Sequence, residues 1–198
     1  MTVRAIHEFG DPVLRDSCQP VTRFDTGLAR LVTDLQETCR LPGRAGLAAP
    51  QIGAGLRVFC YNIDGDEGYL VNPRLVASHG DQDGPEGCLS IPGLYLPVPR
   101  ADHAVVTGVD VTGQPIEVEG TGLLARCLQH ELDHLDGRLY LDRLSVSDRR
   151  HALSVLRTRQ LTAPASVGRT RPAQPASRAP DRRPGRPGRP HRSRPARP

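Results

Sequence analysis

The sequence predicts an α+β fold, with mixed or antiparallel β-sheets around one central helix and a further helix near the N-terminus. Two observations predict this class. Strand-like runs come first and the central helix follows them, with no regular alternation of strands and helices. Before the strands, apolar residues recur at helical spacing, at Leu28, Leu31, Val32 and Leu35. The length of 198 residues suits one folded domain with an appendage.

The N-terminal region is predicted to be an extended segment followed by that helix. Residues 3–23 are expected to be extended, with a turn at Asp11-Pro12, because proline fixes its own φ and pushes the preceding residue toward β. The helix is expected from Asp25 to about Arg40, with Asp25 or Thr26 as its N-cap.

Four strands are predicted in the middle of the chain. They are rich in β-branched and aromatic residues, or they alternate apolar with polar residues. They span Leu56–Tyr61, Tyr69–Pro73, His103–Val109 and Pro115–Glu119. Between them, residues 86–92 are interpreted as a loop and residues 93–99 as a variable rim. The stretch 46–53 is small, apolar and turn-rich, and no strand is predicted there.

Two helices are predicted in the C-terminal half. The first runs from Leu123 to about Leu135, and Gly137 suits its end because helices commonly stop at a glycine in the left-handed conformation. The second is expected over residues 147–160, with Ser147 as N-cap and an apolar face that contains Leu153 and Leu156.

The first of these two helices carries the pattern HExxH in His130, Glu131 and His134. Residues four apart lie on one face of a helix, so both imidazoles can reach one metal ion. Glu131 then lies beside the ion, where a general base for water belongs. The alternative is a surface helix that has these residues at these spacings by chance.

A catalytic site of this kind needs a third protein ligand and one open position. Downstream, His151 is the only histidine before the tail, and it lacks the spacing of ordinary zinc peptidases. Upstream, Cys88 lies in a Gly-Cys-Leu-Ser loop, and one thiolate with two imidazoles suits zinc or ferrous iron. The alternative for Cys88, and the interpretation we adopt for the other four cysteines, is a small buried hydrophobic residue.

Three segments together resemble the bacterial peptide deformylases, of the actinobacterial type, in their order and approximate separations. They are Gly46-Leu-Ala-Ala-Pro-Gln51, Glu86-Gly-Cys-Leu-Ser90 and Gln129-His-Glu-Leu-Asp-His134. The resemblance covers roughly residues 4–145 and implies an α+β fold in which the HExxH helix binds the metal.

The resemblance also implies roles for individual residues. Cys88, His130 and His134 are expected to be the metal ligands, and Glu131 the acid/base. The side-chain amide of Gln51 and the backbone N–H of Leu89 are expected to stabilise an oxyanion. Gly46 is expected close to the substrate backbone, and Gly87 in the same cleft.

The implied activity is hydrolysis that removes the N-formyl group from the N-terminal formylmethionine of newly made proteins. Water activated by the metal attacks the formyl carbon, and Glu131 accepts a proton and passes it to the leaving nitrogen, as general acid–base catalysis requires. The cofactor implied is one divalent metal ion per chain, Fe²⁺ in preference to Zn²⁺ or Ni²⁺. Formyl-Met nascent peptides are the implied substrate.

A pocket for methionine is expected on the face of the helix that carries the histidines. Leu123, Arg126 and Cys127 precede His130 by seven, four and three residues and so share its face. Leu123 and Cys127 suit an apolar wall, although core packing explains them nearly as well. Arg126 fits there only if its stem lines the wall and its head reaches water or a carboxylate. Arg44 replaces a family glycine, and we expect it at the mouth of the cleft, where it narrows the opening or touches the peptide beyond methionine.

The chain is predicted to divide into a catalytic domain, residues 1–162, and an Arg/Pro-rich tail, residues 163–198, whose composition predicts disorder. The tail contains ten arginines and one acidic residue, so it carries a formal charge of +9 and the rest of the chain −5. The tail, or the basic helix before it, is a candidate for contact with the ribosome through RNA phosphates. A tail without a role is the alternative. A nucleic-acid-binding protein with a structural metal is the rival function.

Cysteine content and hydropathy indicate the cellular compartment in which the protein is expected. Five cysteines, an odd number without scaffold spacing, argue against a disulfide framework and favour a reducing cytoplasm. No apolar stretch approaches the roughly 18 residues of a membrane helix, and the N-terminus lacks the features of a secretory signal. We therefore expect a cytoplasmic enzyme with no membrane partner.

Overall fold

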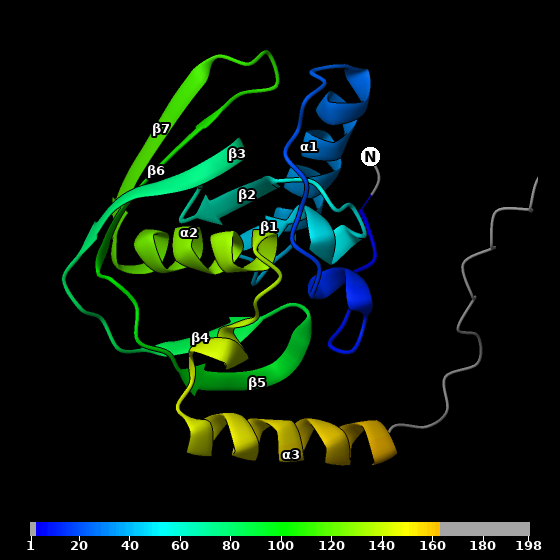
Figure 1. The fold of residues 1–198 in the computed structure, drawn as a ribbon, viewed down its shortest axis with the longest axis vertical. Helices are drawn as coiled ribbons and strands as arrows, with labels where there is room; N and C mark the ends of the chain where they lie inside the picture. Colours follow the sequence, from blue (N-terminus) through cyan, green and yellow to red (C-terminus); the bar gives the residue numbers. More distant parts are fainter. Residues whose placement is uncertain (1–2, 163–198) are drawn as a thin grey trace, which may run out of the picture. The chain divides into compact units, whose positions relative to one another are not determined.

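The computed structural model describes residues 3–162, and an antiparallel five-stranded sheet is their largest element (Figure 1). The strand order is β1-β2-β3-β6-β7. The bounds are β1 Gly46–Ala48, β2 Val58–Ile63, β3 Asp66–His79, β6 His103–Val109 and β7 Pro115–Thr121. A separate antiparallel hairpin consists of β4 (Pro85–Cys88) and β5 (Ile91–Pro97). The predicted α+β class is confirmed.

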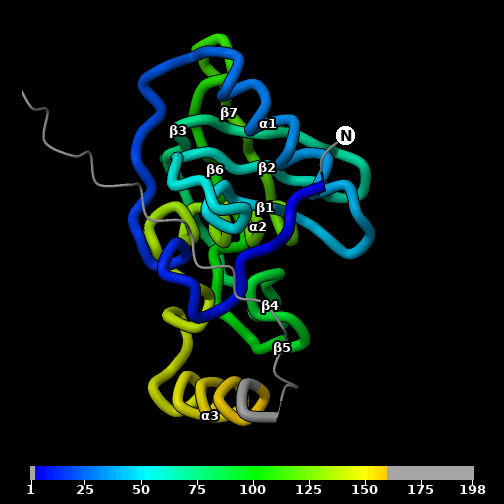
Figure 2. Tube along the Cα trace, turned by 90° about the vertical axis from the view of Figure 1, so that its right-hand side faces the viewer, coloured from blue at the N-terminus to red at the C-terminus, as the bar shows by residue number. Residues whose placement is uncertain are grey.

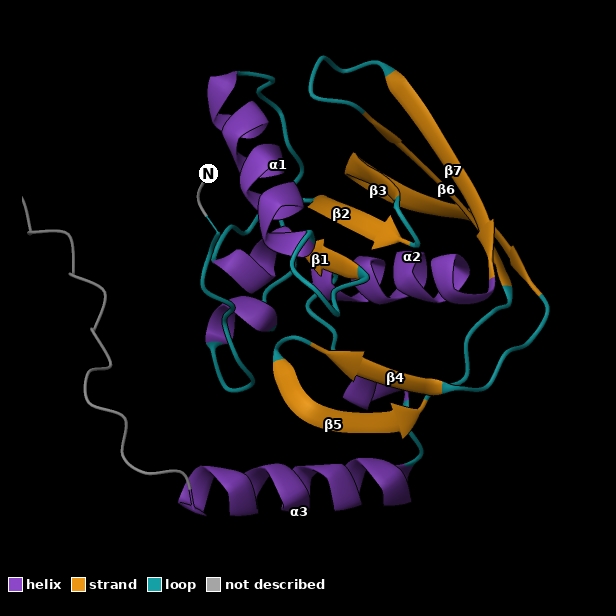
Figure 3. Ribbon diagram, turned by 180° about the vertical axis from the view of Figure 1, so that it is seen from behind, coloured by secondary structure: helices purple, strands orange, loops and turns teal. Residues whose placement is uncertain are grey.

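Within residues 3–162, three α-helices accompany these strands. They are α1 (Thr26–Cys39), α2 (Gly122–Leu135) and α3 (Val146–Thr162), with short 3₁₀ helices η1 (Pro12–Leu14), η2 (Ala49–Ile52) and η3 (Tyr140–Arg143). Helix α2, which carries HExxH, lies between the five-stranded sheet and the β4–β5 hairpin, and α3 lies on the far side of the hairpin (Figure 3). The view in Figure 2 shows the same order of layers from the side.

Helices α1 and α2 pack on opposite faces of the sheet because side chains alternate along each strand. On β2, Val58 and Cys60 pack in one hydrophobic cluster with α1, whereas Phe59 and Tyr61 pack in another with α2. All four side chains are buried. A strand covered on both faces has no polar side to present, which explains why this segment is an uninterrupted apolar run.

A third cluster joins the hairpin to α3 and η3. Ile91 and Val98 pack there with Tyr140, Leu141 and, from α3, Ala152 and Leu156. The hydroxyl of Tyr140 also donates to the carbonyl oxygen of Leu94 at 3.0 Å. The hairpin is therefore held from its outer side by the chain that follows α2.

Most predicted elements are confirmed with small shifts at their ends, but β3 runs from Asp66 to His79 where only Tyr69–Pro73 was predicted. Asp25 caps α1 as expected, with Oδ1 accepting from the N–H groups of Gly27 and Leu28. The predicted N-cap of α3 is wrong, because the helix begins at Val146 and Ser145 Oγ accepts from the N–H of Asp148. A serine hydroxyl caps equally well from either position, so propensity alone does not choose between the two.

Strands β1, β4 and β5 were not predicted, and residues 86–92 and 93–99 are not simply a loop and a rim. Residues 46–53 and 86–99 contain several glycines and prolines, which indicate turns when only local preference is considered. Backbone pairing with distant segments makes them strands: Gly46–Ala48 pairs with β2, and Glu86 lies opposite Leu96.

The predicted disordered tail lies outside the described residues. Within residues 3–162, no helix is long and apolar enough to span a bilayer.

Candidate metal centre

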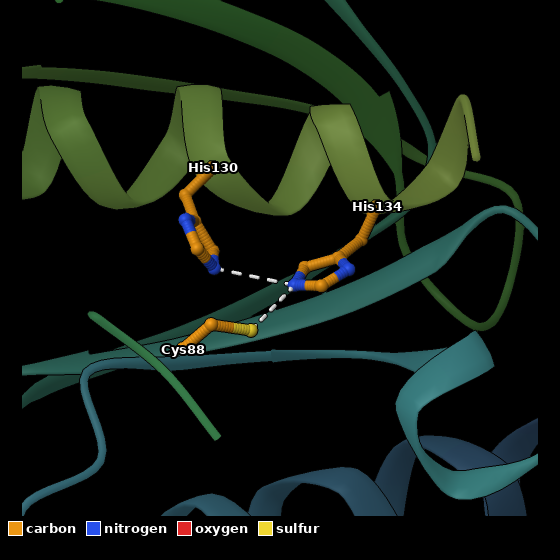
Figure 4. A group of neighbouring side chains, drawn as sticks. All are labelled: Cys88, His130 and His134. Atoms are coloured by element: carbon orange, nitrogen blue, oxygen red, sulfur yellow. Dashed lines mark hydrogen bonds between the residues drawn. The ribbon is translucent and has the colours of Figure 1, made fainter. Parts of the chain in front are cut away.

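Cys88, His130 and His134 converge on one point between α2 and the hairpin (Figure 4). The two histidines extend from consecutive turns of α2, and Cys88 is the last residue of β4. Nε2 of His134 lies 3.2 Å from Cys88 Sγ and 3.2 Å from His130 Nε2. This is the one group of three or more His, Cys, Asp or Glu ligand atoms within residues 3–162 that is close enough to hold a metal ion.

Glu86 determines which nitrogen of His130 faces this point. Its Oε1 lies 2.7 Å from His130 Nδ1. Burial raises the pKa of Glu86, but hydrogen bonds from Arg100 and His130 outweigh burial and lower that pKa to about 2. The carboxylate is therefore ionised and can only accept, so Nδ1 donates to it and Nε2 is the nitrogen that faces Cys88 and His134.

Three such donor atoms lie this close together only when a cation, either a proton or a metal ion, lies among them. Zinc bonds of about 2.3 Å to sulfur and about 2.0 Å to nitrogen give tetrahedral edges of roughly 3.3–3.6 Å between ligand atoms. Two of the three separations, from His134 Nε2 to Cys88 Sγ and to His130 Nε2, are 3.2 Å and close to these edges, and all three ligand atoms lie within 4.8 Å of one another. The donor set and its spacing therefore fit one tetrahedral divalent ion.

The charges at the site favour the thiolate that a metal requires. Burial raises the pKa of Cys88, but the charges of His134 and hydrogen bonds from both imidazoles outweigh it and lower the pKa to about 5. Burial lowers the pKa of His130, whereas its hydrogen bonds to Cys88 and Glu86 raise it above the ordinary value. Without a cation, the site therefore favours a thiolate beside a protonated imidazole.

Glu131 lies beside the three ligand atoms without contributing to their cluster. It is buried, and its Oε2 has no hydrogen-bond partner among residues 3–162. Burial is the main reason that its pKa rises to about 7, against the lowering effect of His130 and His134. A carboxylate with such a pKa, and with a free oxygen, is suited to exchange protons near neutral pH.

A pocket of about 340 Å³ opens onto these residues. Of the twelve residues singled out from the sequence, all except His134 line it; His134 is 1% exposed and lies behind the others. The lining ones are Arg44, Gly46, Gln51, Gly87, Cys88, Leu89, Leu123, Arg126, Cys127, His130 and Glu131. The site is therefore a cleft with the ligand cluster at its base.

Two glycines of the cleft have no room for a side chain. A Cβ at Gly46 would overlap Oε1 of Glu131 and lie 2.6 Å from Cys127 Sγ. A Cβ at Gly87 would overlap the ring of Tyr95, which rests on that backbone. These positions are glycine because other parts of the site occupy the space.

Gln51 and Leu89 flank the ligand cluster from two elements. Gln51 is buried on η2, where its Oε1 accepts from the N–H of Ala48 at 2.9 Å. Its Nε2 donates to Ser90 Oγ at 3.2 Å and approaches Cys88 Sγ at 3.5 Å. Leu89 lies in the turn between β4 and β5. The amide of Gln51 therefore has a fixed orientation, with one hydrogen directed at the thiolate.

The two arginines of the cleft differ in what their heads contact. The guanidinium of Arg126 donates to Glu86 Oε2 at 3.0 Å and to the carbonyl of Val98 at 2.8 Å, so its head reaches a carboxylate as expected. Arg44 Nη1 donates to the carbonyl of Thr38 at 2.9 Å, in the last turn of α1. Arg44 thus lines the cleft while its head is anchored on the helix end.

Sequence reasoning missed several residues that build the site. Glu86 had a signal, since it is an acid two positions before Cys88 in the same motif. Arg100, which holds Glu86, had none, because a lone arginine after a proline-rich stretch resembles any surface residue. Tyr95 lies in the segment interpreted as a variable rim.

Comparisons with known proteins point to one family. Residues 3–150 match the family model described as polypeptide deformylase. A peptide deformylase from Acidothermus cellulolyticus is 54% identical over 157 residues, which are 79% of this chain and 87% of that protein. One from Parafrankia sp. is 50% identical over 159 residues, with the same coverage.

Solved structures agree as well. The crystal structure of a peptide deformylase from Legionella pneumophila matches with a TM-score of 0.74 and 41% identity, over 82% of this chain and 100% of that chain. One from Thermus thermophilus matches with a TM-score of 0.75 and 40% identity, over 80% of this chain and 96% of that chain. The chain therefore belongs to the polypeptide deformylase family, a family of metal-dependent hydrolases.

Proposed function

We propose that this chain removes the N-formyl group from the N-terminal formylmethionine of newly made proteins. Family membership supports the reaction class. The observation that carries the proposal is the convergence of Cys88, His130 and His134 at the base of a cleft, with the carboxylate of Glu131 beside them. This arrangement would supply three ligands and one proton acceptor and would leave one position of a tetrahedral ion open, as amide hydrolysis at a metal requires.

The proposed ligands are Cys88 Sγ and the Nε2 atoms of His130 and His134, holding one divalent ion per chain. When bound, such an ion supplies Lewis acidity, which polarises the formyl oxygen and lowers the pKa of water. The resemblance favours Fe²⁺, and a donor set of one thiolate and two imidazoles also suits Zn²⁺. Ni²⁺ is the further substitute that we expect.

Glu131 is the proposed general acid/base. Its unpartnered Oε2 accepts a proton from the attacking water, and the same carboxyl later donates that proton to the leaving amine nitrogen. A pKa raised to about 7 by burial suits both steps, because neither protonation state is strongly favoured at neutral pH.

Gln51 and Leu89 are the proposed oxyanion donors. Gln51 Nε2 donates to Cys88 Sγ at 3.5 Å, and sulfur is a weak acceptor, so this hydrogen is the one available to a developing negative charge. The hydrogen bond to Ser90 holds the amide in place meanwhile. The backbone N–H of Leu89 would donate from the opposite element. Loss of one such donor commonly costs about 3–4 kcal/mol in the transition state.

The proposed methionine pocket uses the exposed face of the first turns of α2. Leu123 is 55% exposed although it is large and apolar, and it lines the cleft with the thiol of Cys127. Burial raises the pKa of Cys127, so this thiol stays neutral and apolar in character. We expect the peptide backbone to pass close to Gly46, with Gly87 in the same cleft. Arg44 would border the peptide beyond methionine.

We further propose a cytoplasmic location and contact with the ribosome. All five cysteines are free, which suits a reducing compartment. Arg149, Arg150 and Arg157 are exposed on α3, where they form a basic face suited to RNA phosphates. The same basic face also suits the rival function, nucleic-acid binding with a structural metal. That rival predicts RNA binding without deformylase turnover.

The test is anaerobic turnover of formyl-Met-Ala-Ser by the full chain, with metal content measured on the same samples. We expect about one metal ion per chain in the unmodified protein, loss of the ion in Cys88→Ala, and retention of the ion in Glu131→Ala. Turnover in Glu131→Ala should fall by a factor of about 10²–10⁴, the usual contribution of general acid–base catalysis. A full metal complement without turnover in the unmodified chain would reject the proposed substrate.

A further inference from the structure

A chain of four charged side chains connects His130 with a second groove of the protein. Its members, in order from His130, are Glu86, Arg100, Asp133 and Arg143. Glu86 and His130 line the cleft described above, whereas Arg100, Asp133 and Arg143 line a separate groove of about 510 Å³. This series of ion pairs, the ion-pair chain, therefore runs through the protein from the cleft to the groove.

The inner half of this ion-pair chain is buried. Glu86 Oε1 contacts His130 Nδ1 at 2.7 Å. Arg100 holds both carboxylate oxygens of Glu86, with Nη2 at 2.6 Å from Oε1 and Nε at 2.9 Å from Oε2. This bidentate geometry fixes the plane of the carboxylate and therefore the direction of its bond to the imidazole.

The outer half continues the alternation of charge. The remaining nitrogen of Arg100, Nη1, donates to Asp133 Oδ2 at 2.7 Å. Arg143 approaches Asp133 from the other side, with Nε 3.0 Å from Oδ2 and Nη2 bonded to Oδ1. The side chain of Asp133 is 4% exposed and that of Arg143 is 42% exposed. Arg143 is thus the solvent-exposed end of the ion-pair chain.

Each buried member depends on its neighbours for compensation of its charge. An ion removed from water and left without a partner is strongly unfavourable, so a buried pair moves or reorganises when one side is lost. Without Asp133, Arg100 would keep Glu86 but lose the anchor for its third nitrogen. Without Arg143, Asp133 would have only Arg100 to neutralise it.

We propose that Asp133 and Arg143 are positioning residues for the metal centre. They hold Arg100, Arg100 holds Glu86, and Glu86 keeps Nδ1 of His130 protonated and Nε2 directed at the ion. The inference rests on the proposed function, in which His130 is a ligand. Groups that orient a metal ligand in this indirect way typically change metal affinity by about 10–100-fold when they are removed.

The experiment measures Zn²⁺ affinity of the full chain by competition with a chelator, for Asp133→Asn, Arg143→Met and Arg143→Lys. Asp133→Asn should weaken binding by about 10-fold or more, and Arg143→Met by a smaller factor in the same direction. Arg143→Lys should recover part of the loss, because it restores the charge without the two-nitrogen contact.

Arg149→Met is the matched control. The side chain of Arg149 is 47% exposed, close to that of Arg143, and pairs with Asp142 at 2.9 Å outside the ion-pair chain. It should leave Zn²⁺ affinity unchanged. A merely structural role would lower the unfolding temperature of the variants without changing the affinity of the folded protein.

Co²⁺ loading separates this inference from the proposed function. Thiolate ligation gives an absorption band that Cys88→Ala should abolish. If the unmodified chain shows no such band, the proposed metal centre is wrong. If the band is present and both Arg143→Met and Asp133→Asn bind Zn²⁺ as tightly as the unmodified chain, only the positioning role is overturned. Should Asp133→Asn fail to fold, the surface variant Arg143→Met decides the question.

Discussion

The two sides of the candidate site differ in how firmly the fold holds them. Helix α2, which carries His130, Glu131 and His134, is enclosed between the sheet and the hairpin, and ten of its fourteen residues are buried. The hairpin has only two strands, with Cys88 at the end of β4 and Leu89 in the turn that follows, and its outer cover, α3, buries only Ala152 and Leu156 within residues 146–159.

This difference indicates that the two sides of the site differ in stability. The histidines and the proposed base belong to the main core, so their geometry is as stable as the fold. Cys88 packs against a smaller cluster that depends on η3 and α3, whereas the side chain of the neighbouring Leu89 packs against the cluster of α1 and the sheet. Loss of site geometry should therefore begin on the hairpin side, and three changes test that expectation.

The largest effect is expected from matched truncations in the two cores. Leu128 on α2 is fully buried against the sheet, and Leu156 on α3 is 7% exposed against the hairpin. Leu128→Ala should lower the free energy of unfolding by about 4 kcal/mol and Leu156→Ala by about 2 kcal/mol, measured by urea denaturation. Equal losses would contradict the view that the hairpin side is held more weakly.

The second change tests the tight packing of the sheet side. A Cβ at Gly46 would displace Glu131 or Cys127, so Gly46→Ala should lower kcat/KM for formyl-Met-Ala-Ser by about 100-fold, the usual cost of a misplacement near 1 Å. Gly55→Ala is the control, because a Cβ there meets no atom within 4 Å and its φ is not in the left-handed region. Full activity in Gly46→Ala would show that the proposed base tolerates displacement.

The smallest effect is expected at the rim of the hairpin. Arg159 on α3 donates to the carbonyls of Pro92 and Gly93 at 3.0 Å each, and both residues line the cleft. Arg159→Met should cost about 1 kcal/mol of stability, because exposed hydrogen bonds contribute little. In turnover of formyl-Met-Ala-Ser, KM should rise and kcat should change by a smaller factor.

Arg157→Met serves as the control for that change. It removes a neighbouring arginine of the same helix whose side chain makes no hydrogen bond within residues 3–162. If the two variants have the same KM, α3 does not support the rim of the cleft.

Local patterns were enough to predict the elements with strong periodicity and the residues within short motifs. The helix at Asp25, the strands β2, β6 and β7 and the HExxH helix all follow from side-chain spacing, because neighbouring residues alone decide which face is apolar. The pair of histidines on one face of α2 has the same origin, since helix geometry places them one turn apart.

Contacts between distant segments decided the rest. Strands β4 and β5 exist because their backbones pair with each other and pack on η3 and α3, although their glycines and prolines favour turns. The ion-pair chain from Glu86 to Arg143 joins residues that lie 14, 33 and 10 positions apart in the sequence. A charged side chain carries no local sign of its partner, because the charge is tolerated only once folding has brought the opposite charge to it.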